Sequence, residues 1–383
     1  MGQDDVLTMI PGPTPVLPSI LEALGRPTVS HQSPAFVEAY RRCLERLRRI
    51  ARADGAHPFV VSGAGTLAME MALVNLAGRG QEILVLSHGY FGDRWIEIAG
   101  AFGVSARVLR AEWGQAVDPD ALRAALDESE PVAVAMTHVD TSTGTLAPVA
   151  DYCACLRGRK ALAILDGVSA TAGIGERFDD WGLDVLVTGA QKALGAPPGV
   201  AILLASDRAL ARREALGAIP AYFADLARWR RVMEDPGAYF STSPVNEIFA
   251  LDTAMGIVLE EGLDARFQRH ERIAAALRAG LADLGLSLFT APQNRAATLS
   301  VVLHPPGVDD GRFRAEVASR GVVVAGGLGP LAGHGFRIGH MGNIGLPEVL
   351  RTLDAIAGAL VACGRPVRAD GARSVAEREF AAT

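Results

Sequence analysis

The sequence predicts an α/β fold, with a large domain built on a mostly parallel seven-stranded sheet and a smaller C-terminal α+β domain. Two observations predict it. Short apolar runs of strand length alternate with helical segments between residues 59 and 204, and long helical patterns with only a few strands follow residue 250. Such alternation produces parallel strands whose connecting helices cover both faces of the sheet. The 383 residues, 49% of them apolar, are enough for two hydrophobic cores.

Residues 1–20 are predicted to form an N-terminal arm. Prolines recur through Pro11–Pro18, where they fix the backbone in extended conformations that exclude a helix. From Ser33 to about Ala53 apolar residues recur at helical spacing, with Arg and Glu on the other faces, so a helix is expected there.

The large domain is predicted to span residues 21–250 and to carry the sheet. Each expected strand is a short apolar run bounded by polar or glycine-rich segments. Ligands of such sheets bind at the carboxyl ends of the strands, so the loops at that edge are the first place to look for a site. The expected strands are Phe59–Ser62, Ile83–Ser87, Ala106–Leu109, Val132–Met136, Ala161–Leu165, Val185–Thr188 and Val200–Leu204.

The small domain is predicted to span residues 251–365, followed by a polar, frayed tail over 366–383. A long helix over Phe249–Glu261 leads into it. The elements expected inside it are a helix over Leu263–Leu284, a strand over Thr298–Leu303, a helix over Gly311–Ser319 and a strand over Val322–Val324.

Composition excludes several classes of function. The net charge is −6 and basic residues are scattered, so no nucleic-acid or membrane-binding patch is expected. No apolar run reaches membrane-spanning length. The acidic N-terminal residues, where a signal peptide would be basic, predict a cytoplasmic location. The four cysteines are too dispersed to form a metal site and are expected to be reduced.

A single lysine stands at the centre of the apolar segment Leu186–Ala201. Burial would lower the pKa of Lys192 and make its amine a nucleophile suited to Schiff-base chemistry. Upstream, Asp166 ends a continuous apolar strand, where a carboxylate can pair with the protonated ring nitrogen of pyridoxal phosphate (PLP). Alone, Lys192 would be a lysine reaching solvent and Asp166 a turn former. Together they favour a PLP site.

Two loops at the same edge suit such a cofactor. In the first, Ala64, Gly65 and Thr66 open a helix whose N-terminus can bind a phosphate. The surrounding segment also matches a dinucleotide-binding fingerprint, but the next strand ends at His88 without the carboxylate that would hold a ribose. This disfavours a nicotinamide enzyme. In the second, Phe91 lies between glycines, where its ring can stack on a planar cofactor or plug the core.

With these motifs the chain resembles the class V aminotransferases, which are fold-type I PLP enzymes, and within them the alanine/serine–glyoxylate aminotransferase group. The resemblance runs from Pro11-Gly12-Pro13-Thr14, through His138-Val139-Asp140-Thr141-Ser142-Thr143-Gly144, to Arg337-Ile338-Gly339. Two positions depart from the family pattern, because His88 replaces a commoner Asn and Asp140 the usual Glu.

The resemblance implies a role for each matching residue. Lys192 and Asp166 are implied to be catalytic, Arg337 to bind the substrate carboxylate, and Tyr239 and Thr242 to reach the partner's phosphate across the interface of a homodimer. No metal is implied. The residues implied to bind PLP are Ala64, Gly65, Thr66, Phe91, Thr143, Asp166, Val168, Gln191, Lys192, Tyr239 and Thr242.

The implied activity is a ping-pong transfer of an amino group from alanine or serine to a 2-oxo acid such as glyoxylate or pyruvate. An aminotransferase for 2-aminoethylphosphonate or phosphoserine is an alternative, since its extra anion pocket would be invisible in the sequence. A PLP-dependent lyase on the same fold is another. A desulfurase is disfavoured because it usually needs a nucleophilic cysteine on a mobile loop, and the four cysteines lie in or beside expected helices.

Overall fold

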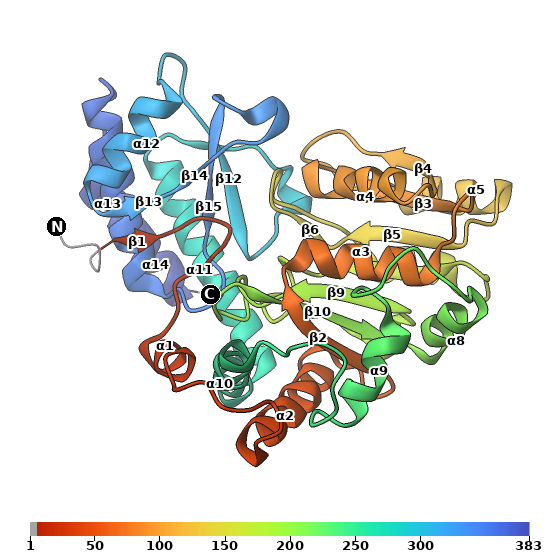
Figure 1. Ribbon diagram of the computed structural model, residues 1–383. Coiled ribbons are helices and arrows are strands. Elements are labelled where there is room, and N and C mark those ends of the chain that lie inside the picture. The colour runs from red at the N-terminus through yellow and green to blue at the C-terminus, as the bar shows by residue number, and fades with distance from the viewer. Residues whose placement is uncertain (1–5, 383) are drawn as a thin grey trace.

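A seven-stranded sheet organises the larger body of the computed structural model, which describes residues 6–382 (Figure 1). Neighbours from β9 to β4 are parallel, whereas β10 is antiparallel to both β2 and β9. The predicted mostly parallel sheet is confirmed, and each expected strand lies within two residues of an observed one. In sheet order the strands are β2 (His57–Gly63), β10 (Gly199–Ala205), β9 (Val185–Gly189), β8 (Leu162–Asp166), β5 (Ala133–Thr137), β3 (Glu82–Ser87) and β4 (Ser105–Arg110).

Helices cover the faces of this sheet, which explains why its central strands are apolar runs. Every residue of β5, β8 and β9 is buried, as expected for strands packed on both sides. Helix α3 packs against β9 and β10, and α4 packs against β3 and β4. The helices of this body are α1 (Pro18–Leu24), α2 (Pro34–Ala51), α3 (Gly65–Leu76), α4 (Tyr90–Ala101), α5 (Pro119–Glu128), α6 (Val149–Leu156), α7 (Phe178–Trp181), α8 (Asp207–Ala215), α9 (Leu226–Glu234) and α10 (Val245–Glu261).

The smaller body holds an antiparallel four-stranded sheet in the order β11-β12-β15-β14. The start of the arm belongs to it, because β1 (Leu7–Thr8) pairs in parallel with β13 (Val322–Val323). The other strands are β11 (Ser287–Leu288), β12 (Leu299–Leu303), β14 (Ala325–Gly326) and β15 (Gly335–Gly339), and the helices are α11 (Leu263–Asp283), α12 (Asp310–Ser319), α13 (Leu346–Ala362) and α14 (Ala369–Ala382). Short 3₁₀ turns span Pro292–Asn294 and Gly329–Leu331, and a small hairpin joins β6 (Val139–Asp140) to β7 (Thr145–Leu146).

Two of the predicted domain limits differ from the packing. The predicted boundary after residue 250 falls inside α10, whose buried residues as far as Val258 belong to the core of the larger body. The frayed tail is also wrong for most of its length, because α14 packs against α11 and α13. Ala372 and Ala376, one helical turn apart, are small enough for that close approach, and the guanidinium of Arg272 lies 4.1 Å from the centre of the Phe380 ring.

A third, smaller apolar cluster joins the two bodies. It brings residues from loops at the carboxyl edge of the large sheet, among them Ala170 and Ala193, against β12 and Met341 of the smaller body. The edge of the sheet where the site is predicted is therefore closed on one side by the smaller body. Within residues 6–382, no helix has both the length and the apolar character that crossing a membrane requires.

Candidate active site

A cavity of about 140 Å³ lies at the carboxyl edge of the large sheet, between the ends of β8 and β9 and the first turns of α3 and α4. Most of the predicted site residues line it, although they come from four separate segments of the chain. The predicted residues in its wall are Ala64, Gly65, Thr66, Phe91, Asp166, Val168, Gln191 and Lys192.

Lys192 lies in the turn that follows β9. Its Nζ donates a hydrogen bond to the backbone carbonyl of Pro11, in the N-terminal arm. The pKa of Lys192 is lowered to about 8, chiefly by burial and also by the nearby Arg337, while Asp166 acts in the opposite direction. The chain contains one other lysine, Lys160, whose side chain is 90% exposed. Near pH 8 about half of the Lys192 amine is therefore neutral.

Asp166 ends β8 and is 4% exposed. The pKa of its carboxyl is raised to about 7, chiefly by burial and also by Asp140 and Glu176. The backbone N–H of Val168, which donates to Oδ1 over 2.9 Å, and the charge of Arg94 oppose this increase. No cationic side chain within residues 6–382 forms an ion pair with Asp166. A buried carboxyl without a cation is what a protonated ring nitrogen would complement.

The N-terminus of α3 forms another part of the wall. Ala64 precedes the helix in an extended conformation and contributes no side-chain cap to its first N–H groups. A Cβ atom on Gly65 would lie 2.8 Å from a methyl group of Val168, so glycine allows this close approach. Arg94 Nη1 donates to Thr66 Oγ1 over 3.2 Å. Uncapped N–H groups, a hydroxyl and a guanidinium together suit an anion such as phosphate.

The loop around Asp140 fixes the position of Phe91. Asp140 Oδ2 accepts hydrogen bonds from the backbone N–H groups of Phe91 (2.9 Å) and Gly92 (3.1 Å), at the start of α4. Its Oδ1 accepts from the N–H of Ser142 over 2.9 Å, and Ser142 Oγ accepts from the N–H of Tyr90 over 2.9 Å. A carboxylate at a helix N-terminus is stabilised by the unpaired N–H groups there. Asp140 therefore holds α4, and with it the ring of Phe91, against the cavity.

The structure places Thr143 outside the cavity, contrary to its predicted contact with the cofactor. Its hydroxyl lies 3.4 Å from the carbonyl oxygen of Asp140, in the same loop, and 3.3 Å from that of His88, in the segment between β3 and α4. The residue in the cavity wall is instead Thr141. Thr143 Oγ1 also accepts a hydrogen bond from the N–H of Thr145 over 3.3 Å, so its hydroxyl is engaged by backbone groups and is not part of the cavity wall.

Arg337 lies beside the cavity wall, on β15 of the smaller body. Its Nε donates to the carbonyl of Gly326 over 2.8 Å and its Nη1 to that of Thr141 over 3.3 Å. Burial lowers the pKa of its guanidinium, and Asp140 acts in the opposite direction. Arg337 thus reaches the large body at the threonine that lines the cavity.

Tyr239 and Thr242 do not line the cavity of their own chain. They lie in the segment between α9 and α10, where Tyr239 is 63% exposed and its ring centre is 5.4 Å from that of His31. Their predicted contact with a partner chain stays a prediction.

Five residues in the cavity wall were not predicted: Met69, Arg94, Val139, Thr141 and Ser169. Arg94 is three positions after Phe91 in α4, so helical spacing alone places both on one face. Its guanidinium lies 4.7 Å from the centre of the Phe91 ring. Once Phe91 is predicted to face the cofactor, the helical spacing from Phe91 predicts that Arg94 faces it as well.

Comparison with known proteins identifies the family. The family model described as "Aminotransferase class-V" matches residues 20–332. An uncharacterized aminotransferase of Methanocaldococcus jannaschii is 36% identical over 95% of each chain. Alanine–glyoxylate aminotransferase 1 of Saccharomyces cerevisiae is 34% identical over 91% of this chain and 96% of its own. The crystal structure of ureidoglycine–glyoxylate aminotransferase from Bacillus subtilis matches with a TM-score of 0.94 and 29% identity over 98% of each chain. The chain therefore belongs to the class V aminotransferases.

Proposed function

We propose that this class V aminotransferase binds PLP in the described cavity and moves an amino group from alanine or serine to glyoxylate or pyruvate in two half-reactions. The observation that carries the proposal is the meeting of Lys192 and Asp166 in one cavity wall, the amine with a lowered pKa and the carboxyl without a cation. Two relatives are named as glyoxylate aminotransferases, the alanine–glyoxylate enzyme of Saccharomyces cerevisiae and the ureidoglycine–glyoxylate enzyme of Bacillus subtilis, and these names support glyoxylate as the oxo acid.

The residues present fit PLP. The uncapped N-terminus of α3, with Thr66 and Arg94, would hold the phosphate. Asp166 would accept a hydrogen bond from the ring nitrogen, and Phe91 and Val168 would enclose the ring. When bound, the cofactor supplies an electron-withdrawing ring that stabilises negative charge at the α-carbon of an amino acid.

The side chain of Gln191 supplies a further observation. Its Oε1 atom is buried and has no hydrogen-bond partner among residues 6–382. Leaving a buried polar atom unpaired costs about 1–3 kcal/mol, so an unpaired acceptor in the cavity wall points to a donor that a ligand brings.

Lys192 is proposed to hold the cofactor and to act as the base. Near pH 8 a substantial fraction of its Nζ is neutral, so it can take the proton from the α-carbon of the donor amino acid and deliver it at the end of the half-reaction. Asp166, as a carboxylate, would keep the ring nitrogen protonated throughout.

Arg337 is proposed to orient both substrates by their carboxylates. No carboxylate within residues 6–382 forms an ion pair with it, and both of its observed hydrogen bonds go to backbone carbonyls. A planar guanidinium can bind a carboxylate through two parallel hydrogen bonds. An Arg337→Met variant is expected to raise KM for the amino donor and to leave PLP affinity unchanged.

The enzyme is further proposed to be a homodimer in which Tyr239 and Thr242 contact the partner's cofactor. The large exposed fraction of Tyr239 supports this. Light scattering would measure the oligomeric state, and a monomer that binds PLP as tightly as the dimer would contradict the shared site. The predicted cytoplasmic location stays a prediction.

The deciding experiment is the absorption spectrum of the protein supplied with PLP, before and after excess L-alanine or L-serine. A cofactor band near the visible edge should be lost with the true donor and restored by glyoxylate or pyruvate, and a Lys192→Ala variant should show neither change. A band that only 2-aminoethylphosphonate or phosphoserine converts would favour the alternative substrates. A band that no amino acid converts would favour a lyase, and no bound PLP would refute the proposal.

A further inference from the structure

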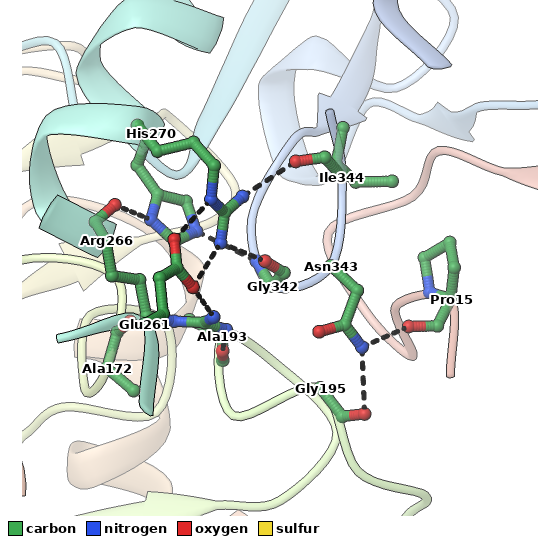
Figure 2. A network of polar contacts seen from close by, with 11 residues as sticks. Pro15, Ala172, Ala193, Gly195, Glu261, Arg266, His270, Gly342, Asn343 and Ile344 are labelled. Atoms are coloured by element: carbon green, nitrogen blue, oxygen red, sulfur yellow. Dashed lines mark hydrogen bonds and ion pairs between the residues drawn. The ribbon is translucent and has the colours of Figure 1, made fainter. Parts of the chain in front are cut away.

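One buried arginine connects the two loops that carry Lys192 and Asp166. Arg266 lies in the first turns of α11 and is 1% exposed (Figure 2). Its Nε donates to the carbonyl of Ala172 over 2.9 Å, and its Nη2 donates to the carbonyl of Ala193 over 2.6 Å. Ala193 directly follows Lys192, and Ala172 is in the loop that begins at Asp166. A single planar guanidinium therefore holds both loops.

These loops leave the sheet, so its backbone ladder does not hold them together. The ladder between β8 and β9 ends with the pair Asp166 and Val187. Beyond it, Ala172 has a φ of 67°, in the left-handed region that side chains rarely adopt. Such a conformation persists when surrounding contacts impose it, and the bond from Arg266 to the Ala172 carbonyl is one of these contacts.

The charge of Arg266 is balanced within the same cluster. Glu261 Oε2 lies 2.6 Å from Arg266 Nη1, and its Oε1 lies 2.6 Å from Arg269 Nε. Burial lowers the pKa of Arg266, with Glu261 opposing the change. A buried guanidinium is tolerated when it is paired and its N–H groups are bonded, and Figure 2 shows bonds from all three of its nitrogens.

His270 connects this cluster to the loop over residues 342–344. Its Nε2 accepts a hydrogen bond from the N–H of Gly342 over 2.9 Å, so the proton of the neutral ring must be on Nδ1, which lies 2.8 Å from the carbonyl of Arg266. In the neighbouring loop, Asn343 Nδ2 donates to the carbonyl of Gly195, in the turn after Lys192. The cluster thus joins α11, the 342–344 loop and the lysine loop (Figure 2).

We propose that Arg266 is a positioning residue, which sets the placement of Lys192 relative to Asp166 by holding the carbonyls of Ala193 and Ala172 on one guanidinium. The catalytic consequence rests on the proposed function, in which Lys192 moves the α-proton. The structural consequence, that both loops depend on Arg266, does not.

Arg269 provides a matched control. It lies in the same helix and pairs with the same Glu261, but its other bonds go to the carbonyls of Ile344 (2.7 Å) and Gly342 (3.0 Å). Replacing either arginine by methionine removes one partner of Glu261 and keeps an unbranched, uncharged stem in place of the arginine's aliphatic part. Only Arg266→Met removes the bonds to the two active-site loops.

The test measures hydrogen exchange by mass spectrometry on the cofactor-free proteins. The bonds from the N–H groups of Gly173 to Ala170 O (2.7 Å) and of Gly195 to Lys192 O (2.9 Å) make both loops protected in the wild type. Arg266→Met should speed exchange over residues 170–174 and 192–196. Arg269→Met should speed exchange over residues 342–346 and leave 170–174 unchanged. Equal patterns in the two variants, or unchanged exchange in both loops of Arg266→Met, would overturn the proposal.

The second readout is steady-state kinetics on the PLP-loaded enzymes. A displacement of the base by about 1 Å can cost roughly 100-fold in rate, so Arg266→Met should lower kcat by that order with KM for the amino donor little changed. Unchanged kcat would overturn the positioning role. If the methionine variant does not fold, Arg266→Lys serves instead, since one ammonium cannot replace a fork that bonds two carbonyls. A wild type that turns over no amino acid would refute the proposed function, while the exchange data would still decide the role of Arg266.

Discussion

Lys192 Nζ donates a hydrogen bond to the carbonyl oxygen of Pro11, 181 residues earlier in the chain. The arm is also bonded to the lysine backbone, because Thr14 Oγ1 donates to the carbonyl of Lys192 over 2.9 Å and the N–H of Thr14 donates to the carbonyl of Gln191 over 3.2 Å. The N-terminal arm is therefore part of the site, and it bonds to both the side chain and the backbone of the lysine.

At Gly12 the contact between the arm and Lys192 leaves no room for a side chain. Its φ is 114°, and a Cβ atom there would lie 2.5 Å from Lys192 Cδ. We expect Gly12→Ala to displace the arm or the lysine, to cost about 1–3 kcal/mol of unfolding free energy through overpacking, and to weaken PLP binding measured by absorbance titration. Gly80→Ala is the control, since Gly80 also has a positive φ, of 78°, but open space around it. Equal PLP affinity in the two variants would contradict the expectation.

The raised pKa of Asp166 predicts a pH-dependent stability of the cofactor-free protein. The folded carboxyl titrates near pH 7 and the unfolded one near its ordinary value of 3.8. Between these values the folded state binds the extra proton, so the contribution of Asp166 to stability is present below the unfolded pKa and is lost as pH rises through the folded pKa. The loss amounts to at most about 4 kcal/mol, at 1.36 kcal/mol per pKa unit.

Asp166→Asn should remove this contribution. Unfolding by urea at pH 5 and pH 8 would measure it, and the wild type should lose more stability than the variant between the two pH values. The same decrease in both proteins would mean that another buried group, such as Asp184, causes the change, because burial also raises the pKa of that carboxyl.

The fold could be predicted from the sequence because the buried strands are visible one by one. The run ending at Asp166 is apolar throughout, since β8 is covered on both faces. The limits of the two bodies could not be predicted in the same way. The arm pairs Leu7 with Val322, and a contact over such a distance in sequence leaves no local pattern. The segment of α14 was predicted to be a frayed polar tail because the helix packs through small alanines, which give its sequence little amphipathic pattern.

The site could be predicted wherever a residue's type and its place at a strand end agree, as for Lys192 and Asp166. It could not where the loop path decides which side chain faces inward. Thr141 and Thr143 are chemically identical and two positions apart, yet the first lies in the cavity wall and the hydroxyl of the second bonds to the backbone carbonyls of Asp140 and His88. The sequence carries no signal for the role of Arg266, because its partners in the two active-site loops are backbone carbonyls.

Substituting Thr141 and Thr143 one at a time should have different effects, one on PLP affinity and the other on stability. Thr141→Val removes a hydroxyl from the cavity wall and should weaken PLP affinity by about tenfold, the value of one hydrogen bond of roughly 1–1.5 kcal/mol. Thr143→Val removes the hydrogen bonds to the carbonyls of His88 and Asp140 and should cost about 1 kcal/mol of unfolding free energy with PLP affinity kept. Titration with PLP and thermal unfolding measure the two effects. The opposite assignment, with Thr143 controlling affinity, would restore the prediction made from the family pattern.

Arg94 should act on the phosphate rather than on the ring. No carboxylate within residues 6–382 forms an ion pair with it, and its guanidinium is bonded to the hydroxyl of Thr66 at the uncapped N-terminus of α3. A charge-assisted hydrogen bond of this kind contributes about 1.5–3 kcal/mol, so Arg94→Met should weaken PLP binding by at least about tenfold. Pyridoxal, which lacks the phosphate, is the control ligand, and its affinity should change little.

The comparison of the two ligands distinguishes this role of Arg94 from stacking. The guanidinium also lies over the ring of Phe91, and a variant that merely let Phe91 move would weaken both ligands equally, because both carry the same ring. Phe91→Leu provides that reference pattern. Equal losses for PLP and pyridoxal in Arg94→Met would therefore assign Arg94 to support of the aromatic ring, whereas a loss confined to PLP would assign it to the phosphate.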